Sequence, residues 1–299
     1  MPVGASSDAP VWCAVADSDT SSSAERGRLA GLLAAEAQRA DRVLLVTCQR
    51  VELYGVGARE WPVAGMRLLA GEAAVRRVFR IAAGLESQIT GEDEVLGQVR
   101  AASASAPPAA RDPRLRRLFE SAVAAGRRCR AGRGPTGNSL AALAARTLLE
   151  MSNGSDRPFM VAGAGYMGAA LALSLRRRAP SLTVASRSLE RARALAAKVG
   201  AAAITLGDAA TVAPSAGGLA VALGGAWPAR FAAGSLPPTV DLSSPPALPR
   251  EACRNYRGID QFLAGGRADD GDYRVRAAAV VDAAVASFFD SMASRAVGV

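Results

Sequence analysis

The chain has 299 residues, of which half are apolar, and a formal net charge of +9. This length predicts two domains with sizeable cores, and the apolar content excludes a disordered chain. Arginine supplies nearly all of the positive charge, because Lys198 is the only lysine. The charge suits a polyanion such as tRNA, but a bias toward arginine throughout the chain explains it equally well.

Cysteine and histidine usage excludes one kind of metal site. The four cysteines, Cys13, Cys48, Cys129 and Cys253, show no close pairing, and the chain has no histidine. A zinc site of the usual spacing is therefore excluded, and the unpaired thiols indicate a reducing cytoplasm. The sequence has no export signal and no apolar run long enough to span a membrane, so we expect a cytoplasmic protein without membrane contact.

The first part of the chain predicts a small α+β unit. Its expected elements are a strand (11–16), a helix (24–40) and two further strands (43–46 and 51–56). In the helix, Leu29, Leu32 and Leu33 are expected on one face. The connection between the last two strands, residues 47–50, is a short bend whose side chains can face a cleft.

This bend holds the most reactive side chain of the region. The thiol of Cys48 is a nucleophile only as thiolate, and the neighbouring guanidinium of Arg50 favours that form. Arg50 could equally bind a substrate carboxylate in a two-pronged geometry. A single cysteine is more often a small core residue, but the flanking Thr47, Gln49 and Arg50 favour a functional one.

A helix and a polar segment follow the bend. Residues 71–83 predict an amphipathic helix, with apolar Val75, Val78, Phe79 and Ala82 on one side and Arg76, Arg77 and Arg80 on the other. In the segment from Glu86 to Gln98, the polar groups of Ser87, Glu92, Glu94 and Gln98 could converge on a substrate. Helix capping and surface charge are the alternative for Glu92 and Glu94.

Residues 111–133 carry eight arginines on a helical pattern. The apolar residues expected inside are Leu115, Leu118, Phe119 and Val123. The arginines could contact phosphates, although a solvated helix face is the more common meaning of such a run. A further apolar helix at 140–151 leads into Ser152-Asn153-Gly154-Ser155, which we interpret as the main domain boundary.

The second half of the chain predicts a dinucleotide-binding domain. A buried strand (159–162) is followed by the loop Gly163-Ala164-Gly165-Tyr166-Met167-Gly168 and a helix (169–178). Such glycines let the backbone approach a pyrophosphate at the helix N-terminus. The next strand (182–185) ends in Ser186-Arg187-Ser188, which favours the 2′-phosphate of NADP over NAD. Later strands at 219–223 and 239–242 predict a doubly wound sheet.

A last helix begins near Asp272. Its expected apolar face consists of Val275, Ala279, Val280, Ala283, Ala286 and Phe289. We therefore expect three parts: an N-terminal catalytic and substrate domain (1–152), an NADP-binding domain (153–270) and a C-terminal helix (271–299).

Three ordered motifs resemble one known family. Thr47-Cys48-Gln49-Arg50-Val51-Glu52-Leu53-Tyr54 is similar to the nucleophile motif of glutamyl-tRNA reductase, which has Asn at the position of Gln49. Residues 84–100 resemble its substrate-pocket segment, and residues 163–168 resemble its nucleotide loop. The resemblance implies an α/β protein with an N-terminal α+β catalytic domain, a Rossmann-type doubly wound NADP-binding domain and a C-terminal helix.

The resemblance also implies an activity and site residues. Cys48 would form a thioester with the glutamyl group of glutamyl-tRNA, and NADPH would reduce it to glutamate 1-semialdehyde for tetrapyrrole synthesis. The implied substrate-binding residues are Thr47, Gln49, Arg50, Ser87, Glu92, Asp93, Glu94 and Gln98. The implied cofactor-binding residues are Gly163, Ala164, Gly165, Tyr166, Met167, Gly168, Ser186, Arg187 and Ser188.

The sequence departs from the family at several points. Arg77 stands where the family has a histidine near the nucleophile, so we expect Arg77 to act in catalysis. Asp17-Ser18-Asp19-Thr20 replaces an Asn/Ser-His-Lys-Thr segment. The family's dimerisation domain has no counterpart here, so we expect a monomer or a helix-mediated homodimer. We expect no binding to DNA. Two alternatives remain open: reduction of another aminoacyl-tRNA or carrier-bound acyl group, and a non-catalytic protein that binds NADP or tRNA.

Overall fold

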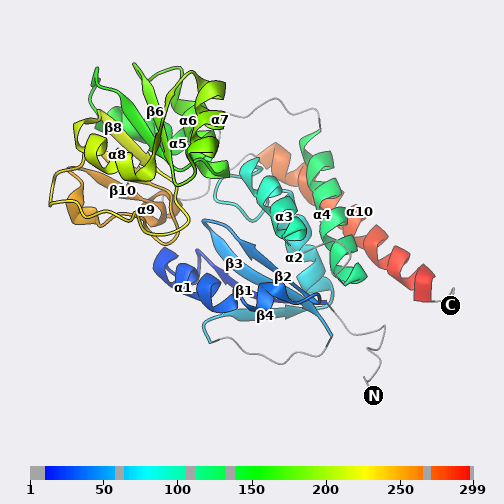
Figure 1. Ribbon diagram of the computed structural model, residues 1–299. Helices are drawn as coiled ribbons and strands as arrows, with labels where there is room; N and C mark the ends of the chain where they lie inside the picture. The colour runs from blue at the N-terminus through cyan, green and yellow to red at the C-terminus, as the bar shows by residue number, and fades with distance from the viewer. Residues whose placement is uncertain (1–10, 58–63, 106–111, 132–138, 265–270, 297–299) are drawn as a thin grey trace. The chain divides into compact units, whose positions relative to one another are not determined.

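The structure is a computed structural model that describes residues 11–57, 64–105, 112–131, 139–264 and 271–296. Within these ranges the chain forms two compact units (Figure 1). Unit 1 contains the described parts of residues 1–22, 28–136 and 266–299, and unit 2 contains those of 23–27 and 137–265. None of the described helices is long and apolar enough to cross a membrane.

Unit 1 contains a four-stranded antiparallel sheet in the order β2-β3-β1-β4. Its strands are β1 (Val11–Asp17), β2 (Arg42–Val46), β3 (Arg50–Val56) and β4 (Arg67–Ala70). The central pair aligns Cys13 with Tyr54 and Asp17 with Arg50. The end of β1 therefore lies beside the start of β3, immediately after the bend that carries Cys48.

The helix that follows β1 is shorter than predicted. The described elements there are α1 (Ser23–Leu33) and a 3-10 turn (Glu36–Gln38). Leu29 and Leu33 are buried, but Leu32 is 60% exposed, so the expectation that all three share a buried face is wrong for Leu32. Successive residues on a helix are about 100° apart, and the buried face includes Leu33 but not its neighbour.

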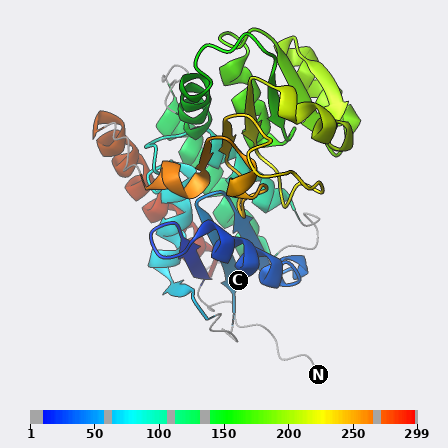
Figure 2. The ribbon, with the colours of Figure 1, turned by 90° about the vertical axis from the view of Figure 1, so that its left-hand side faces the viewer.

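Four helices complete unit 1 around one apolar core. They are α2 (Glu72–Ala82), α3 (Glu94–Ala104), α4 (Pro113–Arg130) and α10 (Gly271–Ala296). Figure 1 and Figure 2 show α10 alongside α2 and α4, although about 140 residues of sequence separate α4 from α10. Edge-to-face ring pairs join Tyr54 with Phe119 and Phe79 with Phe288.

The buried face of α10 differs from the predicted one. The side chains that face the core are Tyr273, Ala277, Val281, Ala284, Val285 and Phe288. Val275 is 72% exposed and Phe289 is 38% exposed, so the predicted apolar face is wrong. Both sets have helical spacing, because small and apolar residues surround much of this helix. The Tyr273 hydroxyl, which donates to the Ala83 carbonyl at 2.7 Å, belongs to the face that packs on unit 1.

Unit 2 is a six-stranded, all-parallel sheet in the order β10-β9-β8-β5-β6-β7. Its strands are β5 (Phe159–Ala162), β6 (Leu182–Ser186), β7 (Ala202–Thr205), β8 (Gly218–Val221), β9 (Thr239–Asp241) and β10 (Tyr256–Gly258). This order is that of the doubly wound dinucleotide-binding fold, in which the direction of winding changes between β5 and β8. The predicted fold class is confirmed.

The helices of unit 2 are α5 (Leu140–Met151), α6 (Tyr166–Leu175), α7 (Leu189–Val199), α8 (Leu206–Val212) and α9 (Ile259–Leu263). Helix α5 packs on α6, β8 and β9. It therefore belongs to unit 2, whereas the sequence placed residues 140–151 in the N-terminal domain. Helix α6 begins inside the glycine loop, earlier than the predicted start at residue 169. The alanine-rich β7 and the three-residue β10 carry little strand signal and were not expected.

Candidate active site

A turn stabilised by one side chain places Cys48 at the tip of the β2–β3 connection. The Thr47 hydroxyl accepts the backbone N–H groups of Gln49 at 3.1 Å and Arg50 at 3.2 Å. The Thr47 backbone N–H in turn donates to the Arg50 carbonyl at 2.9 Å. Cys48 is half-buried, while Gln49 and Arg50 are almost completely buried. Thr47 therefore shapes the turn that presents the thiol.

Gln49 and Arg50 bind this turn to the segment between α2 and α3. The Gln49 side chain donates to Glu92 Oε1 at 3.2 Å and accepts the backbone N–H of Gln88 at 3.1 Å. Arg50 Nη2 donates to the Glu86 carbonyl at 2.6 Å. The predicted convergence of this segment on the Cys48 bend is therefore present in the structure for Glu92.

Two glycines allow the segment to close on itself. Gly84 and Gly91 both have positive φ angles, +72° and +75°. A Cβ at Gly84 would lie 2.7 Å from the Gly91 Cα, and the Gly91 N–H donates to the Gly84 carbonyl at 2.9 Å. Side chains would prevent this approach. The closed loop buries Ser87 and Glu92 on the side of the bend.

Buried polar atoms without partners lie beside the Cys48 bend. Arg50 is 2% exposed, yet its Nε and Nη1 atoms have no hydrogen-bond partner among the described residues. Unsatisfied buried donors are costly, and a guanidinium with free N–H groups fits a carboxylate. The geometry therefore fits an anionic ligand beside Cys48.

Glu92 and Glu94 are two carboxyl groups buried in the same region. Burial, followed by the nearby charge of Glu94, raises the pKa of Glu92 to about 7, although the Ser87 hydroxyl, Arg50 and Arg130 oppose this shift. A carboxyl group with such a pKa is suited to exchange a proton near neutral pH.

The remaining predicted substrate residues lie on or next to α3. Asp93 is exposed and forms an ion pair with Arg130 Nε at 3.2 Å. Gln98 is half-buried and lies one turn after Glu94, on the same side of the helix. The roles of both residues in substrate binding stay predictions.

Arg77 lies in a cluster of carboxylates. Its guanidinium, 11% exposed, contacts Glu52 Oε1 at 2.8 Å, Glu86 Oε2 at 2.9 Å and Asp17 Oδ2 at 3.0 Å. Burial would lower the pKa of Arg77, but Glu52 and Glu86 outweigh it and the pKa rises. Burial likewise opposes ionisation of Asp17 and Glu86, yet their arginine partners lower both pKa values.

Glu52 is the residue of this cluster that the sequence reasoning missed. It is fully buried in β3, where it accepts the Tyr54 hydroxyl at 2.7 Å in addition to binding Arg77. An acidic residue that alternates with apolar ones normally indicates the solvent face of a strand. The arginine that covers Glu52 comes from α2, and local sequence does not reveal that partner.

Unit 2 contains the geometry of a dinucleotide-binding loop. A Cβ at Gly163 would lie 2.1 Å from the Ala222 carbonyl oxygen, and one at Gly168 would lie 2.0 Å from the Gly163 carbonyl oxygen. At Gly165 a Cβ would meet nothing within 4 Å. Gly163 and Gly168 are therefore required for packing, whereas Gly165 borders open space at the N-terminus of α6, where a pyrophosphate fits. Ala164, Tyr166 and Met167 complete this loop.

The end of β6 carries the residues expected to distinguish NADP from NAD. The Ser186 hydroxyl accepts the Ser188 backbone N–H, and the Ser188 hydroxyl accepts the Arg191 N–H and caps α7. Arg187 is exposed, and its Nη2 atom lies 3.9 Å from the position of a Cβ at Gly224. Its guanidinium is therefore placed at the carboxyl end of the sheet, where dinucleotides bind in this fold.

Fold and site together define a two-unit protein that combines a thiol-bearing α+β unit with a Rossmann-type unit homologous to the nucleotide-binding domains of dehydrogenases. Residues 14–132 match the family model described as glutamyl-tRNA reductase, N-terminal domain, and residues 143–222 match that of shikimate/quinate 5-dehydrogenase. Residues 14–132 therefore belong to the glutamyl-tRNA reductase family.

Individual relatives resemble parts of the chain. The glutamyl-tRNA reductase of Methanopyrus kandleri is 37% identical over 177 residues, which cover 54% of this chain and 43% of the relative. That of Deinococcus radiodurans is 38% identical over 195 residues, covering 59% and 55%. The solved Methanopyrus kandleri enzyme aligns with a TM-score of 0.45 at 23% identity, over 94% of this chain and 80% of that one. The chain thus spans about half the length of the curated relatives it matches.

Proposed function

We propose that this protein reduces the glutamyl group of glutamyl-tRNA to glutamate 1-semialdehyde with NADPH. The observation that carries the proposal is the buried Arg50 guanidinium, which has unpaired N–H groups two residues from the half-buried thiol of Cys48. A glutamyl ester has one free carboxylate for Arg50 and one ester carbonyl for a nucleophile. The pocket therefore matches both ends of this substrate.

The chemistry assigned to Cys48 is a transfer of the acyl group. The thiolate sulfur bonds to the ester carbonyl carbon, the bond from that carbon to the tRNA oxygen breaks, and the tRNA leaves with a proton on that oxygen. NADPH, held by the loop at 163–168 and by Arg187, supplies a hydride when bound. The carbon–sulfur bond breaks as the acyl group becomes an aldehyde, and Cys48 returns as the thiolate.

Glu92 is the group we assign to hold the proton in this chain without histidine. Its pKa of about 7 keeps a fraction of it protonated at neutral pH. Its hydrogen bond to Gln49 connects it to the residue next to Cys48. A positioned acid typically contributes about 10²–10⁴-fold to a rate. Arg77, whose charge three carboxylates compensate, is poorly suited to exchange a proton.

The departures from the family motif support a second candidate. Gln49 extends one methylene further than asparagine and fills the space between the bend and Glu92. A narrower pocket would favour another aminoacyl-tRNA or a carrier-bound acyl group as the substrate. The third possibility is a protein that binds NADP or tRNA without turnover, which would reduce neither glutamyl-tRNA nor any of these other acyl donors. Incubation with NADPH and each acyl donor, with aldehyde and NADP⁺ measured together, separates the three.

Replacement of the nucleophile tests the covalent route. Cys48→Ser should abolish aldehyde formation and leave NADPH binding unchanged, because a hydroxyl ionises far less than a thiol at neutral pH. Cys129→Ser is the matched control, since Cys129 is also a half-buried thiol of unit 1. Aldehyde production by Cys48→Ser at a rate near that of the control would refute the thioester mechanism.

A further inference from the structure

The arginines of α2, α3 and α4 fall into two groups. Arg76, Arg77, Arg80, Arg114 and Arg130 each form an ion pair with a carboxylate. A second group on α3 and α4 has no carboxylate partner among the described residues: Arg100, Arg116, Arg117, Arg127 and Arg128. Unpaired arginines at this density keep a strong positive potential over α4. Arg111 and Arg133, the ends of the predicted arginine run, lie outside the described residues.

The spacing along α4 arranges four of these arginines in two parallel rows. Arg116 and Arg127 are eleven residues apart, as are Arg117 and Arg128. Eleven residues make about three helical turns and span roughly 16 Å, so each pair stands on one side of the helix. The two rows are offset by about 100° around the helix axis. We call these four residues together with Arg100 the α4 ridge.

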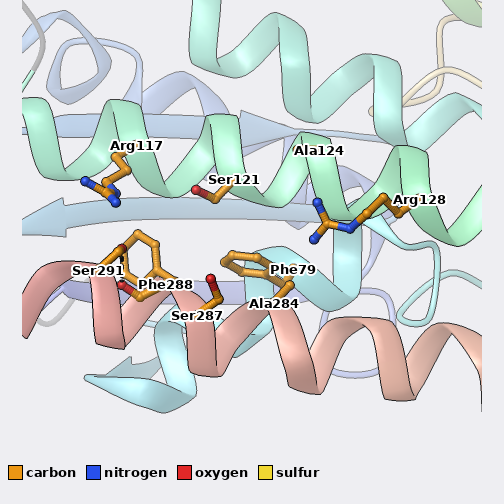
Figure 3. A pocket seen from close by; sticks show the side chains of 9 residues that line it. All are labelled: Phe79, Arg117, Ser121, Ala124, Arg128, Ala284, Ser287, Phe288 and Ser291. Carbon is orange, nitrogen blue, oxygen red and sulfur yellow. Dashed lines mark hydrogen bonds between the residues drawn. The ribbon is translucent and has the colours of Figure 1, made fainter.

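A groove lies along each side of this helix. The groove between α4 and α10 has a volume of about 190 Å³, and Figure 3 shows Arg117 and Arg128 at its two ends with Ser121 between them. Ser287 and Ser291 of α10 face them across the groove. The guanidinium groups and the hydroxyls of Ser121 and Ser287 thus line a channel whose apolar floor, Phe79 and Phe288, is buried. The Ser291 hydroxyl donates instead to the Phe288 carbonyl at 2.6 Å.

The second groove lies between α3 and α4 and has a volume of about 390 Å³. It is lined by Arg100, Arg116 and Arg127 together with Ser103. Glu120 is the one acidic residue among the described residues that line either groove. Both sides of the α4 ridge therefore offer donors to a long anion.

We propose that the α4 ridge binds the phosphate backbone of an RNA, which under the proposed function is the tRNA part of the substrate. A guanidinium binds a phosphate through two parallel hydrogen bonds, and serine hydroxyls are common additional donors to phosphate oxygens. Rows about 16 Å long extend beyond a single small anion, whereas they match a chain of phosphates. The large apolar side chains of the grooves are buried, so the surface lacks the exposed apolar anchors of a membrane-binding helix.

Binding of RNA can be measured without turnover, so its outcome is independent of the proposed reaction. The probe is fluorescein-labelled deacylated tRNA specific for glutamate, titrated with the full chain at several salt concentrations. The test variant replaces Arg116, Arg117, Arg127 and Arg128 by Ala. Loss of four phosphate contacts should weaken binding at least 10-fold near 0.1 M salt and reduce the slope of log K against log salt by about 3.

Two controls separate the α4 ridge from the general charge of the chain. A matched variant replaces four exposed arginines of unit 2, Arg177, Arg178, Arg193 and Arg250, by Ala and loses the same charge. It should change affinity less than 3-fold. Glu120→Gln, which removes the acid from the groove, should strengthen binding about 2- to 5-fold at low salt.

The outcomes decide the proposal. Equal losses in both fourfold variants, or unchanged binding in the ridge variant, would show that the α4 ridge is not an RNA site. Poly-glutamate and phosphatidylserine vesicles serve as competing probes. If the substitutions weaken binding of either probe more than they weaken binding of tRNA, the surface binds an acidic protein or a membrane, and the proposal is wrong. Circular dichroism of each variant confirms that a loss of binding is not a loss of folding.

Discussion

Arg77 shows how the environment of one residue changes its expected role. Its position in the sequence predicts a group near the nucleophile, and its contacts are with three carboxylates from β1, β3 and the segment after α2. A guanidinium has five N–H donors and can bridge three carboxylates, whereas a neutral imidazole has only one N–H donor. Its catalytic role stays a prediction, but these contacts favour a structural one.

Removal of this guanidinium should strongly destabilise unit 1. Arg77→Ala leaves Glu52 buried without its cation, so we expect the free energy of unfolding to fall by about 3–5 kcal/mol in urea titrations at pH 7. Arg80→Ala, which removes a more exposed cation from Glu86, should cost less than about 1 kcal/mol. Similar small losses in both variants would contradict a structural role for Arg77.

Glu92 should make stability depend on pH in a defined window. Its pKa is about 7 in the folded chain and about 4.3 when unfolded, so between these values the folded state binds more protons. The free energy of unfolding should therefore fall as pH rises from about 4.3 to 7, by on the order of 3 kcal/mol. Below this window, the lowered pKa values of Asp17 and Glu86 cause loss of stability as pH falls.

Glu92→Gln tests this prediction, because an amide keeps the hydrogen bond from Gln49 and cannot ionise. In urea titrations, the free energy of unfolding of the variant should rise relative to that of the native chain between about pH 4.3 and 7. Asp93→Asn is the control, since Asp93 is exposed and should leave the pH profile nearly unchanged. Parallel profiles for the native chain and Glu92→Gln would rule out a raised pKa at this position.

In the β5–α6 connection, different positions of one motif require glycine for different physical reasons. Gly168 is required because helix and strand approach closely, whereas Gly165 borders open space where we propose that a ligand approaches the backbone. The motif alone does not separate these two requirements. The backbone around each glycine does, since a Cβ would collide at Gly168 and meet open space at Gly165.

Two alanine substitutions distinguish these requirements. Gly168→Ala should destabilise unit 2 by about 1–3 kcal/mol, because the added Cβ collides with a backbone carbonyl. Gly165→Ala should change thermal unfolding little and weaken NADPH at least 10-fold, since the Cβ occupies the space of the pyrophosphate. NADPH fluorescence titration and thermal unfolding of both variants give the comparison. Unchanged NADPH affinity in Gly165→Ala would place the cofactor elsewhere.

Across the whole chain, unit 1 is assembled from segments near both ends of the described sequence. Helix α10 packs on α2 and α4 and supplies Tyr273, Val281 and Phe288 to their core. Burial of each large apolar side chain contributes about 1.5–3 kcal/mol, which is large beside a total stability of about 5–15 kcal/mol. The last helix is therefore part of the core of unit 1.

Two neighbouring phenylalanines test which face of α10 is buried. Phe288 is 5% exposed and packs on Phe79, whereas Phe289 is 38% exposed. Phe288→Ala should lower the free energy of unfolding by about 3–5 kcal/mol, and Phe289→Ala by less than about 1 kcal/mol. The reverse order in denaturant titrations would show that the face predicted from the sequence packs on unit 1.

Local patterns were sufficient to predict much of this protein. The spacing of Val75, Val78 and Phe79 identified α2 and its buried side, and the strand–glycine loop–helix order identified the dinucleotide fold. The apolar runs on either side of Cys48 identified the bend between β2 and β3. These features depend on residues a few positions apart, whose geometry the backbone largely determines.

Contacts between distant parts of the chain required the three-dimensional structure. The buried face of α10, the carboxylates around Arg77 and the unpaired N–H groups of Arg50 all depend on segments far apart in sequence. Periodicity predicts that a helix has an apolar face, but when small apolar residues surround it, only the surface of its neighbours selects one. Charge pairing follows the same rule, because the free energy of a buried ion depends on the groups packed around it.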